Sequence, residues 1–216
     1  MHLPLPFCVL AFATIGAALS ERVYLDRLAL TYVGILLGLC LSAYSLDELH
    51  GRPNHTHFSD RTLQTAVAVG ITGSALVGIY LAIAVNQYVL ILSAFACFFI
   101  FAYNLELFSG KFHNAAWFGL SWGGISTFGG YYVQATTLTL SSLIVSAMAA
   151  LFSIGILYLT HKFRPSQFSK QFKGTISEAD LVNYSRQARR VGWTVVKIEC
   201  YSMVLLAVGL ILPKVL

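Results

Sequence analysis

The feature that most constrains this chain is a succession of about seven apolar stretches, each long enough to cross a lipid bilayer. A helix needs roughly 20 mostly apolar residues to cross a hydrocarbon core of about 30 Å. Hydrophobic residues make up 57% of the 216 residues and charged residues only 11%, whereas charged residues are about a quarter of a soluble domain. The sequence therefore predicts an all-α fold, in which one membrane domain forms a polytopic bundle of transmembrane helices. The stretches lie at 3–20, 28–46, 64–85, 87–108, 114–134, 138–160 and 194–213.

The long polar segment at residues 161–193 separates the last two stretches. Within it, Thr175-x-x-Glu178 has the spacing of a helix-starting cap, and apolar residues follow at helical spacing. We therefore expect an amphipathic helix at the cytoplasmic interface before the last span, with Arg186, Arg189 and Arg190 facing anionic head groups. A solvated basic linker helix without a lipid role is the alternative.

Positive charge is distributed unevenly over the connecting segments. Most of the 14 Lys and Arg residues fall in alternate loops on one side of the membrane, and only Arg22, Arg27 and Lys214 fall on the other. Because Lys and Arg gather in cytoplasmic loops, we expect a cytoplasmic amino terminus and an external carboxyl terminus. The same bias accounts for the net charge of +5, so we expect no nucleic-acid partner.

The cysteines are interpreted as small packing residues. Cys8, Cys40, Cys97 and Cys200 all lie inside apolar stretches, and no two of them form a CxxC pair. This pattern argues against a disulfide framework or a zinc site.

Polar residues that could carry chemistry gather at the end of the second stretch. Asp47 and His50 are three residues apart and so share one helix face, with Tyr44 one turn earlier. Glu48 points about 100° away, and Arg52 follows after a glycine. A carboxylate and an imidazole on one face can bind a divalent cation, and ionisable residues near membrane depth are functional candidates by default.

A second polar group ends the fourth stretch. Asn104 and Glu106 precede a break at Ser109-Gly110, and Lys111 and His113 follow it. The predicted topology puts this end on the same side of the membrane as the end of the second stretch. We therefore expect the two ends to touch, with Asp47 and Glu106 facing one cavity. The candidate metal ligands are Asp47, Glu48, His50, Glu106 and His113.

These residues resemble a known family. The run AYSLDELHGRPNHTHFSDRTL at 43–63 is similar to the Asn/Asp-rich motif with which UbiA-type membrane prenyltransferases leave their second helix. Tyr103, the loop at Lys111 and FGLSWGG at 118–124 look like the next landmarks of that family. The resemblance covers roughly residues 1–135. The chain departs from the family pattern because Ala43 and Gly51 replace two acidic-motif residues, and because the second acidic motif is missing.

The resemblance implies a shortened, divergent UbiA-like protein that binds an isoprenoid or quinone-like lipid in a cavity opening sideways to the bilayer. It also implies transfer of a prenyl group from an isoprenyl diphosphate, with Mg²⁺ held by the reduced acidic motif. Asp47, Glu106 and Lys111 would then be catalytic. Substrate-binding residues would be Tyr44, Arg52, Tyr103, Asn104, Trp117 and Trp122. Fixed cations at Arg52, Lys111, Lys162 and Arg164 would help to clamp the diphosphate.

Two other functions remain open at this point. Asp47, His50, Glu106 and His113 could hold iron in an intramembrane oxidoreductase, because mixed carboxylate and imidazole ligands suit iron. The chain could also be a non-catalytic subunit that works with membrane-protein partners. The sequence does not decide whether the protein is an enzyme.

Overall fold

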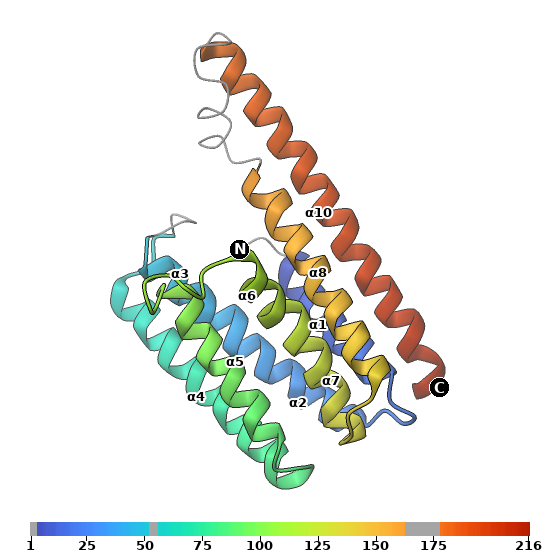
Figure 1. The fold of residues 1–216 in the computed structure, drawn as a ribbon. Coiled ribbons are helices and arrows are strands. Elements are labelled where there is room, and N and C mark those ends of the chain that lie inside the picture. Colours follow the sequence, from blue (N-terminus) through green and yellow to red (C-terminus); the bar gives the residue numbers. More distant parts are fainter. Residues whose placement is uncertain (1–3, 52–55, 163–177) are drawn as a thin grey trace.

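The computed structural model describes residues 4–51, 56–162 and 178–216, and every regular element in this part of the chain is a helix (Figure 1). One continuous helical rod occupies each predicted stretch. Two of the rods contain π-helical segments, in which backbone hydrogen bonds span five residues. The elements are α1 (Pro4–Ala18), α2 (Leu25–Ile35), η1 (Leu36–Ala43), α3 (Tyr44–Leu49), α4 (Asp60–Ala84), α5 (Val89–Asn104), α6 (Ala115–Gly119), η2 (Leu120–Gly124), α7 (Ile125–Ala135), α8 (Leu140–Lys162) and α10 (Glu178–Val215).

Four helices in the described part of the chain are long and apolar enough to cross a membrane. They are Leu25–Leu49, Asp60–Ala84, Leu140–Leu159 and Arg186–Val215. The apolar helices at Leu5–Ala18 and Val89–Asn104 are shorter. At 1.5 Å per residue, α1 and α5 are about 22–24 Å long, which is less than the hydrocarbon thickness. The fold is therefore that of a membrane protein.

Side-chain hydrogen bonds and one left-handed residue mark several of the helix ends. The Ser59 hydroxyl accepts a hydrogen bond from the Thr62 N–H at 3.2 Å and starts α4. Asn114 accepts hydrogen bonds from the N–H groups of Ala116 and Trp117 at the start of α6. Thr136 ends α7 in the left-handed conformation. Side-chain caps of this kind satisfy N–H groups that the first helical turn leaves free.

Helix α1 is the centre of the bundle. It packs mainly against α7 and α10, and its residues from Cys8 to Ala18 are almost all buried. Cys8 and Phe12 join Cys200 of α10 and Ile156 of α8 in one apolar cluster. A helix that is apolar on every side belongs in an interior, and α1 meets that condition. The buried cysteines accordingly act as packing residues.

Helices α4 and α5 form a second layer beside this core. α4 packs against η1, α5 and α2, and α5 also contacts η1 and α7. In Figure 1 the α4–α5 hairpin lies beside α2 and away from α10. The space between the hairpin and the α2 and α7 rods contains the cavity described below.

The last helix differs from the prediction of two separate elements. Residues 178–193 were expected to form an interfacial helix, but α10 runs from Glu178 to Val215 without a break. Its 38 residues would be about 57 Å long, far more than a membrane core needs. Figure 1 shows the helix projecting beyond the rest of the bundle at its amino-terminal end. The other part of the expected segment, 163–177, lies outside the described residues.

Candidate lipid-binding cavity

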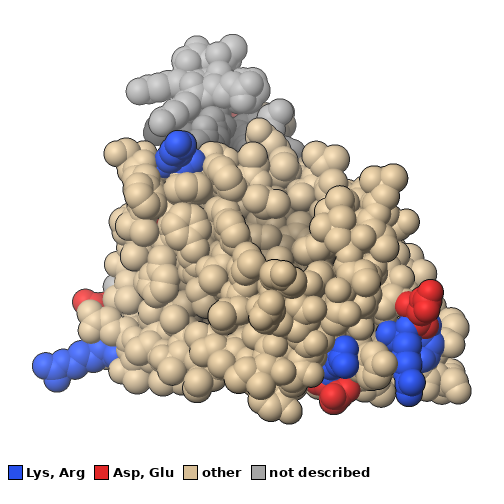
Figure 2. Space-filling view, turned by 60° about the horizontal axis from the view of Figure 1, so that its bottom comes forward, with Lys and Arg blue, Asp and Glu red and all other residues tan. Residues whose placement is uncertain are grey.

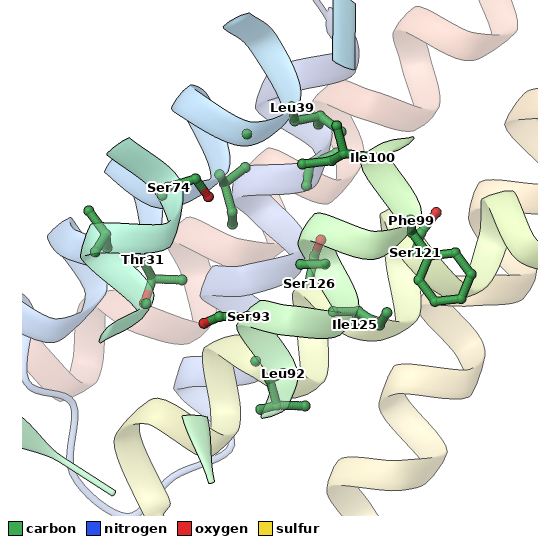
Figure 3. Close-up of a pocket in the computed structure, with 18 of the residues that line it drawn as sticks. Thr31, Leu39, Ser74, Leu92, Ser93, Phe99, Ile100, Ser121, Ile125 and Ser126 are labelled. Carbon is green, nitrogen blue, oxygen red and sulfur yellow. The ribbon is translucent and has the colours of Figure 1, made fainter. Parts of the chain in front are cut away.

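A cavity with about 1040 Å³ of empty space, part of it at an open mouth, lies between the two layers (Figure 3). Its walls come from α2, η1, α4, α5, η2 and α7, with Val9 added by α1. None of the described residues that line it is charged. Figure 2 shows one face of the molecule, on which charged side chains lie toward the periphery and other residues form the middle. The cavity therefore suits an uncharged, apolar occupant.

The cavity runs along most of α5. Residues of α5 from Val89 to Asn104 take part in its lining, and these positions are about 22 Å apart along the helix axis. Both ends of the rod are thus within reach of one elongated ligand.

Both π-helical segments contribute to the cavity wall. Gly38, Leu39 and Ala43 of η1 line it on one side, and Ser121 and Trp122 of η2 line it on another. A π-helix has more residues per turn than an α-helix, so it shifts the side chains that follow to a different face. The two rods therefore present side chains to the cavity that a regular helical repeat would aim elsewhere.

Aromatic rings form the end of the cavity near the carboxyl terminus of α5. Phe99, Tyr103 and Trp122 line it. Trp122 stacks on Phe118 with ring centroids 4.8 Å apart, and the Tyr103 ring lies 5.7 Å from that of Phe118. These ring–ring contacts hold the rings in position. The ring faces attract cations, and the rings also offer a large apolar surface.

Three of the predicted substrate-binding residues line the cavity. They are Tyr103, Asn104 and Trp122. The Asn104 amide donates to the Ile100 carbonyl at 2.6 Å, which holds the side chain against its own helix. Trp117 is not among the lining residues; its ring packs against Phe99 and Phe112 with centroids 5.3 and 5.0 Å away. Tyr44 also lies outside the lining set.

The acidic end of the second rod has a different arrangement from the expected one. Helix α3 contacts α5, so the ends of the second and fourth rods do meet. Asp47 is exposed, whereas Glu48 is fully buried and its Oε1 accepts a hydrogen bond from the Thr56 N–H at 2.8 Å. The carboxylate that points inward is thus that of Glu48. His50 is exposed, and Arg52 lies outside the described residues.

Glu106 lies in a loop and not on a helix. The predicted span 87–108 ends at Asn104, because Glu106, Phe108 and Ser109 have φ values of 49°, 57° and 59°. Residues in this left-handed region cannot continue a right-handed helix. Glu106 is exposed and does not line the cavity, and neither does Asp47.

His113 is held by the end of α5. Its Nδ1 lies 2.9 Å from the Tyr103 carbonyl oxygen, and its ring stacks on Tyr103 at 4.5 Å. Its Nε2 is 4.0 Å from Glu106 Oε1, at the outer limit of an ion pair. Lys111 is exposed on the same loop. Glu106 and His113 are therefore brought together near the aromatic end of the cavity.

The described residues do not by themselves fit a shared metal site. Nowhere in the described ranges do three His, Cys, Asp or Glu side chains gather closely enough to hold one ion. The Glu48 carboxylate is already engaged by a backbone N–H, and Glu106 reaches only His113 among the expected ligands. Binding of Mg²⁺ or iron therefore stays a prediction.

The hydroxyl groups of the cavity were not predicted from the sequence. Thr31, Ser74, Ser93 and Ser126 line it from four different helices (Figure 3). Each is a single small polar residue in an apolar stretch, and such residues are common wherever membrane helices pack closely. Ser74 lies beside Gly38 and Ser93 beside Gly78, each across a helix–helix contact, and both glycines also line the cavity. This pattern could be recognised from the sequence only if the helix pairing were known.

Comparison of the chain with models of protein families, with curated proteins and with solved structures gave no match. The function is therefore argued from the cavity and its surroundings.

Proposed function

We propose that the protein is a multi-pass membrane protein that binds an isoprenoid or quinone-like lipid in the cavity between the α4–α5 hairpin and the α2 and α7 rods. The observation that carries this proposal is a cavity whose described lining holds no charge. Ligand pockets are lined mainly by apolar and aromatic groups with a few polar ones. The cavity has this composition.

The shape of the cavity favours an extended lipid over a compact solute. Its lining follows α5 from Val89 to Asn104, and that distance of about 22 Å is most of the thickness of a hydrocarbon core. A long hydrocarbon chain that moves from the bilayer into an apolar cavity meets surroundings of nearly the same polarity. The aromatic end adds ring faces at Tyr103 and Trp122.

Seven membrane crossings, with the amino terminus in the cytoplasm, are part of the proposal. Figure 1 places the start of α1, α3 and the start of α6 toward one end of the bundle and the carboxyl terminus and the α4–α5 turn toward the other. Arg61 lies at the start of α4, after α3, and Lys111 precedes α6, so both belong to the first end, and Lys and Arg gather on the cytoplasmic side of a membrane. The amino-terminal part of α10 would then extend into the cytoplasm.

Prenyl transfer is the finer activity we propose for the aromatic end. Tyr103 and Trp122 line that end of the cavity, and their π faces would stabilise an allylic cation. The exposed Lys111 and the Glu106–His113 pair lie on the loop that follows α5. A diphosphate leaving group there would lie outside the apolar part of the cavity, within reach of fixed cations.

A variant whose new side chain fills the cavity without disturbing helix packing tests lipid binding. Gly129 lines the cavity, and a Cβ built on it meets nothing within 4 Å. Gly129→Phe should therefore fold and project a ring into the cavity. Gly155→Phe is the matched control, because Gly155 also has open space at its Cβ but does not line the cavity.

Native mass spectrometry of the purified protein measures the outcome. We expect wild type and Gly155→Phe to retain a copurified or added isoprenoid lipid, and Gly129→Phe to lose it. Equal retention by all three proteins would remove the cavity as the binding site. Absence of any retained lipid in the wild type would reject the proposed function.

A further inference from the structure

Three serines that line the cavity have hydroxyls without a hydrogen-bond partner in the described part of the chain. They are Ser74 of α4, Ser93 of α5 and Ser126 of α7. Figure 3 shows them on three separate helices around the same space. We call Ser74, Ser93 and Ser126 the serine belt.

Several other hydroxyls in the bundle bond to their own helix. Thr14, Thr31 and Ser146 donate to the carbonyl one turn earlier at 2.7–2.8 Å. Ser121 also lines the cavity, but its hydroxyl donates to the Phe118 carbonyl at 3.1 Å. Such a local bond can satisfy a serine in an apolar helix. Among the described residues, Thr127 and Ser153 also have hydroxyls without a partner, but neither residue lines the cavity.

Two belt serines lie beside glycines of neighbouring helices. The Ser74 oxygen lies 3.1 Å from where a Cβ on Gly38 would stand, and the Ser93 oxygen lies close to the corresponding point on Gly78. The missing side chains of Gly38 and Gly78 thus leave the room that these two hydroxyls occupy. Both glycines also line the cavity.

The belt extends from a point far from the aromatic end to a point near it. Ser93 and Asn104 are about 16 Å apart along α5, whereas Ser126 is one helical turn from Trp122. A group held between Ser93 and Ser126 would lie within the bundle, before the loop beyond α5 that carries Lys111, Glu106 and His113. Because the described lining is uncharged, that group must itself be uncharged, since an isolated charge in such a place is very costly.

We propose that the serine belt binds a quinone-type ring, whose carbonyl oxygens accept hydrogen bonds from serines on different sides of the cavity. This inference rests on the lipid-binding part of the proposed function and names its ligand class. A hydroxyl can donate one hydrogen bond as well as accept them, so each of the three unpartnered hydroxyls can donate to an acceptor on the ligand. A ring with carbonyl oxygens at opposite edges supplies acceptors to more than one helix, and its alkyl tail fills the remaining apolar length.

Binding of two probes separates this inference from the proposed function. One probe is a benzoquinone carrying a decyl chain, and the other is a dibrominated alkane of similar length with no ring. Both quench tryptophan fluorescence, and Trp122 lines the cavity. We expect wild type to bind both. The triple variant Ser74→Ala, Ser93→Ala, Ser126→Ala should bind the quinone at least about tenfold more weakly, since each lost donor is worth roughly 0.5–1.5 kcal/mol, and should bind the alkane within about twofold of wild type.

Ser146→Ala is the matched control, because it removes a bundle hydroxyl that already donates to the Ser142 carbonyl and does not line the cavity; neither Kd should change. The three single variants are measured as well, each with its thermal unfolding, so that a poorly folded triple variant does not decide the result. Equal quinone affinity in wild type and in all belt variants would overturn the inference, as would a wild type that binds the alkane but not the quinone. A wild type that binds neither probe would overturn the proposed function too.

Discussion

The side-chain amide of Gln134 makes two hydrogen bonds with the backbone of Tyr24. Its oxygen accepts from the Tyr24 N–H at 2.7 Å, and its nitrogen donates to the Tyr24 carbonyl at 3.2 Å. Gln134 is buried at the end of α7, and Tyr24 immediately precedes α2. Arg27 joins them by donating to the Val133 carbonyl at 3.2 Å and by covering the Tyr24 ring. One amide thus ties together the α2 and α7 rods, which contact each other and both contribute to the cavity wall.

Gln134→Leu should destabilise the protein by about 1–3 kcal/mol. The substitution keeps the volume but leaves the N–H and carbonyl of Tyr24 without their partner, and an unsatisfied buried polar group carries its full desolvation penalty. Thermal unfolding in detergent measures the change. Gln87→Leu is the control, since Gln87 is exposed in the α4–α5 turn and its replacement should change stability little. An unchanged unfolding temperature for Gln134→Leu would contradict the expectation.

Two adjacent glycines of α7 should respond in opposite ways to alanine. A Cβ on Gly130 would collide with the carbonyl oxygen of Ala13 in α1, whereas a Cβ on Gly129 meets nothing within 4 Å. Gly130→Ala must push α1 and α7 apart, and overpacking of this kind costs about 1–3 kcal/mol. Gly129→Ala should be neutral or stabilising by up to about 1 kcal/mol, because alanine favours a helix.

Thermal unfolding of the two glycine variants, measured in parallel, tests whether their stabilities differ as expected. Each variant adds the same single methyl group to the same helix, so a difference between them reports only the space at each position. Similar stability for both would mean that α1 and α7 do not approach as closely as the structure has them.

Glu48→Ala should destabilise the end of the second rod by about 1–3 kcal/mol. The carboxylate is fully buried and accepts a hydrogen bond from the Thr56 backbone, so its removal leaves that N–H unpaired. Glu48→Gln retains an acceptor oxygen and should have a smaller effect. Glu21→Ala is the control at an exposed glutamate, where substitutions usually change stability by less than about 0.5 kcal/mol. Proteolysis of the segment after α3 gives a local readout alongside global unfolding.

Asp47→Asn tests the prediction of metal-dependent prenyl chemistry. If Asp47 holds Mg²⁺ on a diphosphate, wild type should retain an isoprenyl diphosphate only with Mg²⁺ present, and Asp47→Asn should lose both this retention and prenyl transfer. Asp26→Asn, an exposed aspartate at the start of α2, should behave as wild type. Elemental analysis of the purified protein completes the test: stoichiometric iron would instead favour the oxidoreductase, and retention without Mg²⁺ would contradict the metal role of Asp47.

The positions of the helices followed from hydrophobicity, because a rod of apolar residues has few other solutions in a bilayer. A helix lies at each expected stretch, while the cap residue Thr175 that predicted the start of α10 lies outside the described residues. Two boundaries were wrong. The fourth rod stops at Asn104 because of a left-handed turn among residues that are not glycine, and no break separates residues 178–193 from the last span. Neither the strained turn nor the continuity of α10 has a compositional signal.

The cavity was only partly predictable. Tyr103, Asn104 and Trp122 were identified from the resemblance and do line it. Ser74, Ser93 and Ser126 were missed, and Asp47 was assigned the inward position that Glu48 occupies. The reason is geometric: η1 precedes α3, and η2 precedes α7. A π-helical segment rotates everything after it relative to a regular 3.6-residue repeat, so a helical wheel drawn from the sequence assigns these side chains to the wrong face.

The unbroken course of α10 fixes the rotational phase of its two halves. Arg186 and Arg189 are exposed on the part that extends beyond the bundle, while Val196 and Cys200 are buried against α1 and α8. Because the helix is continuous, each residue inserted between these halves turns the arginines by about 100° around the axis. One inserted alanine would face them in a new direction, whereas seven would restore the original direction to within about 20°. If a function of this exposed basic segment depends on the direction of its arginines, that function should be lost and regained with the period of the helix as the insertion is lengthened.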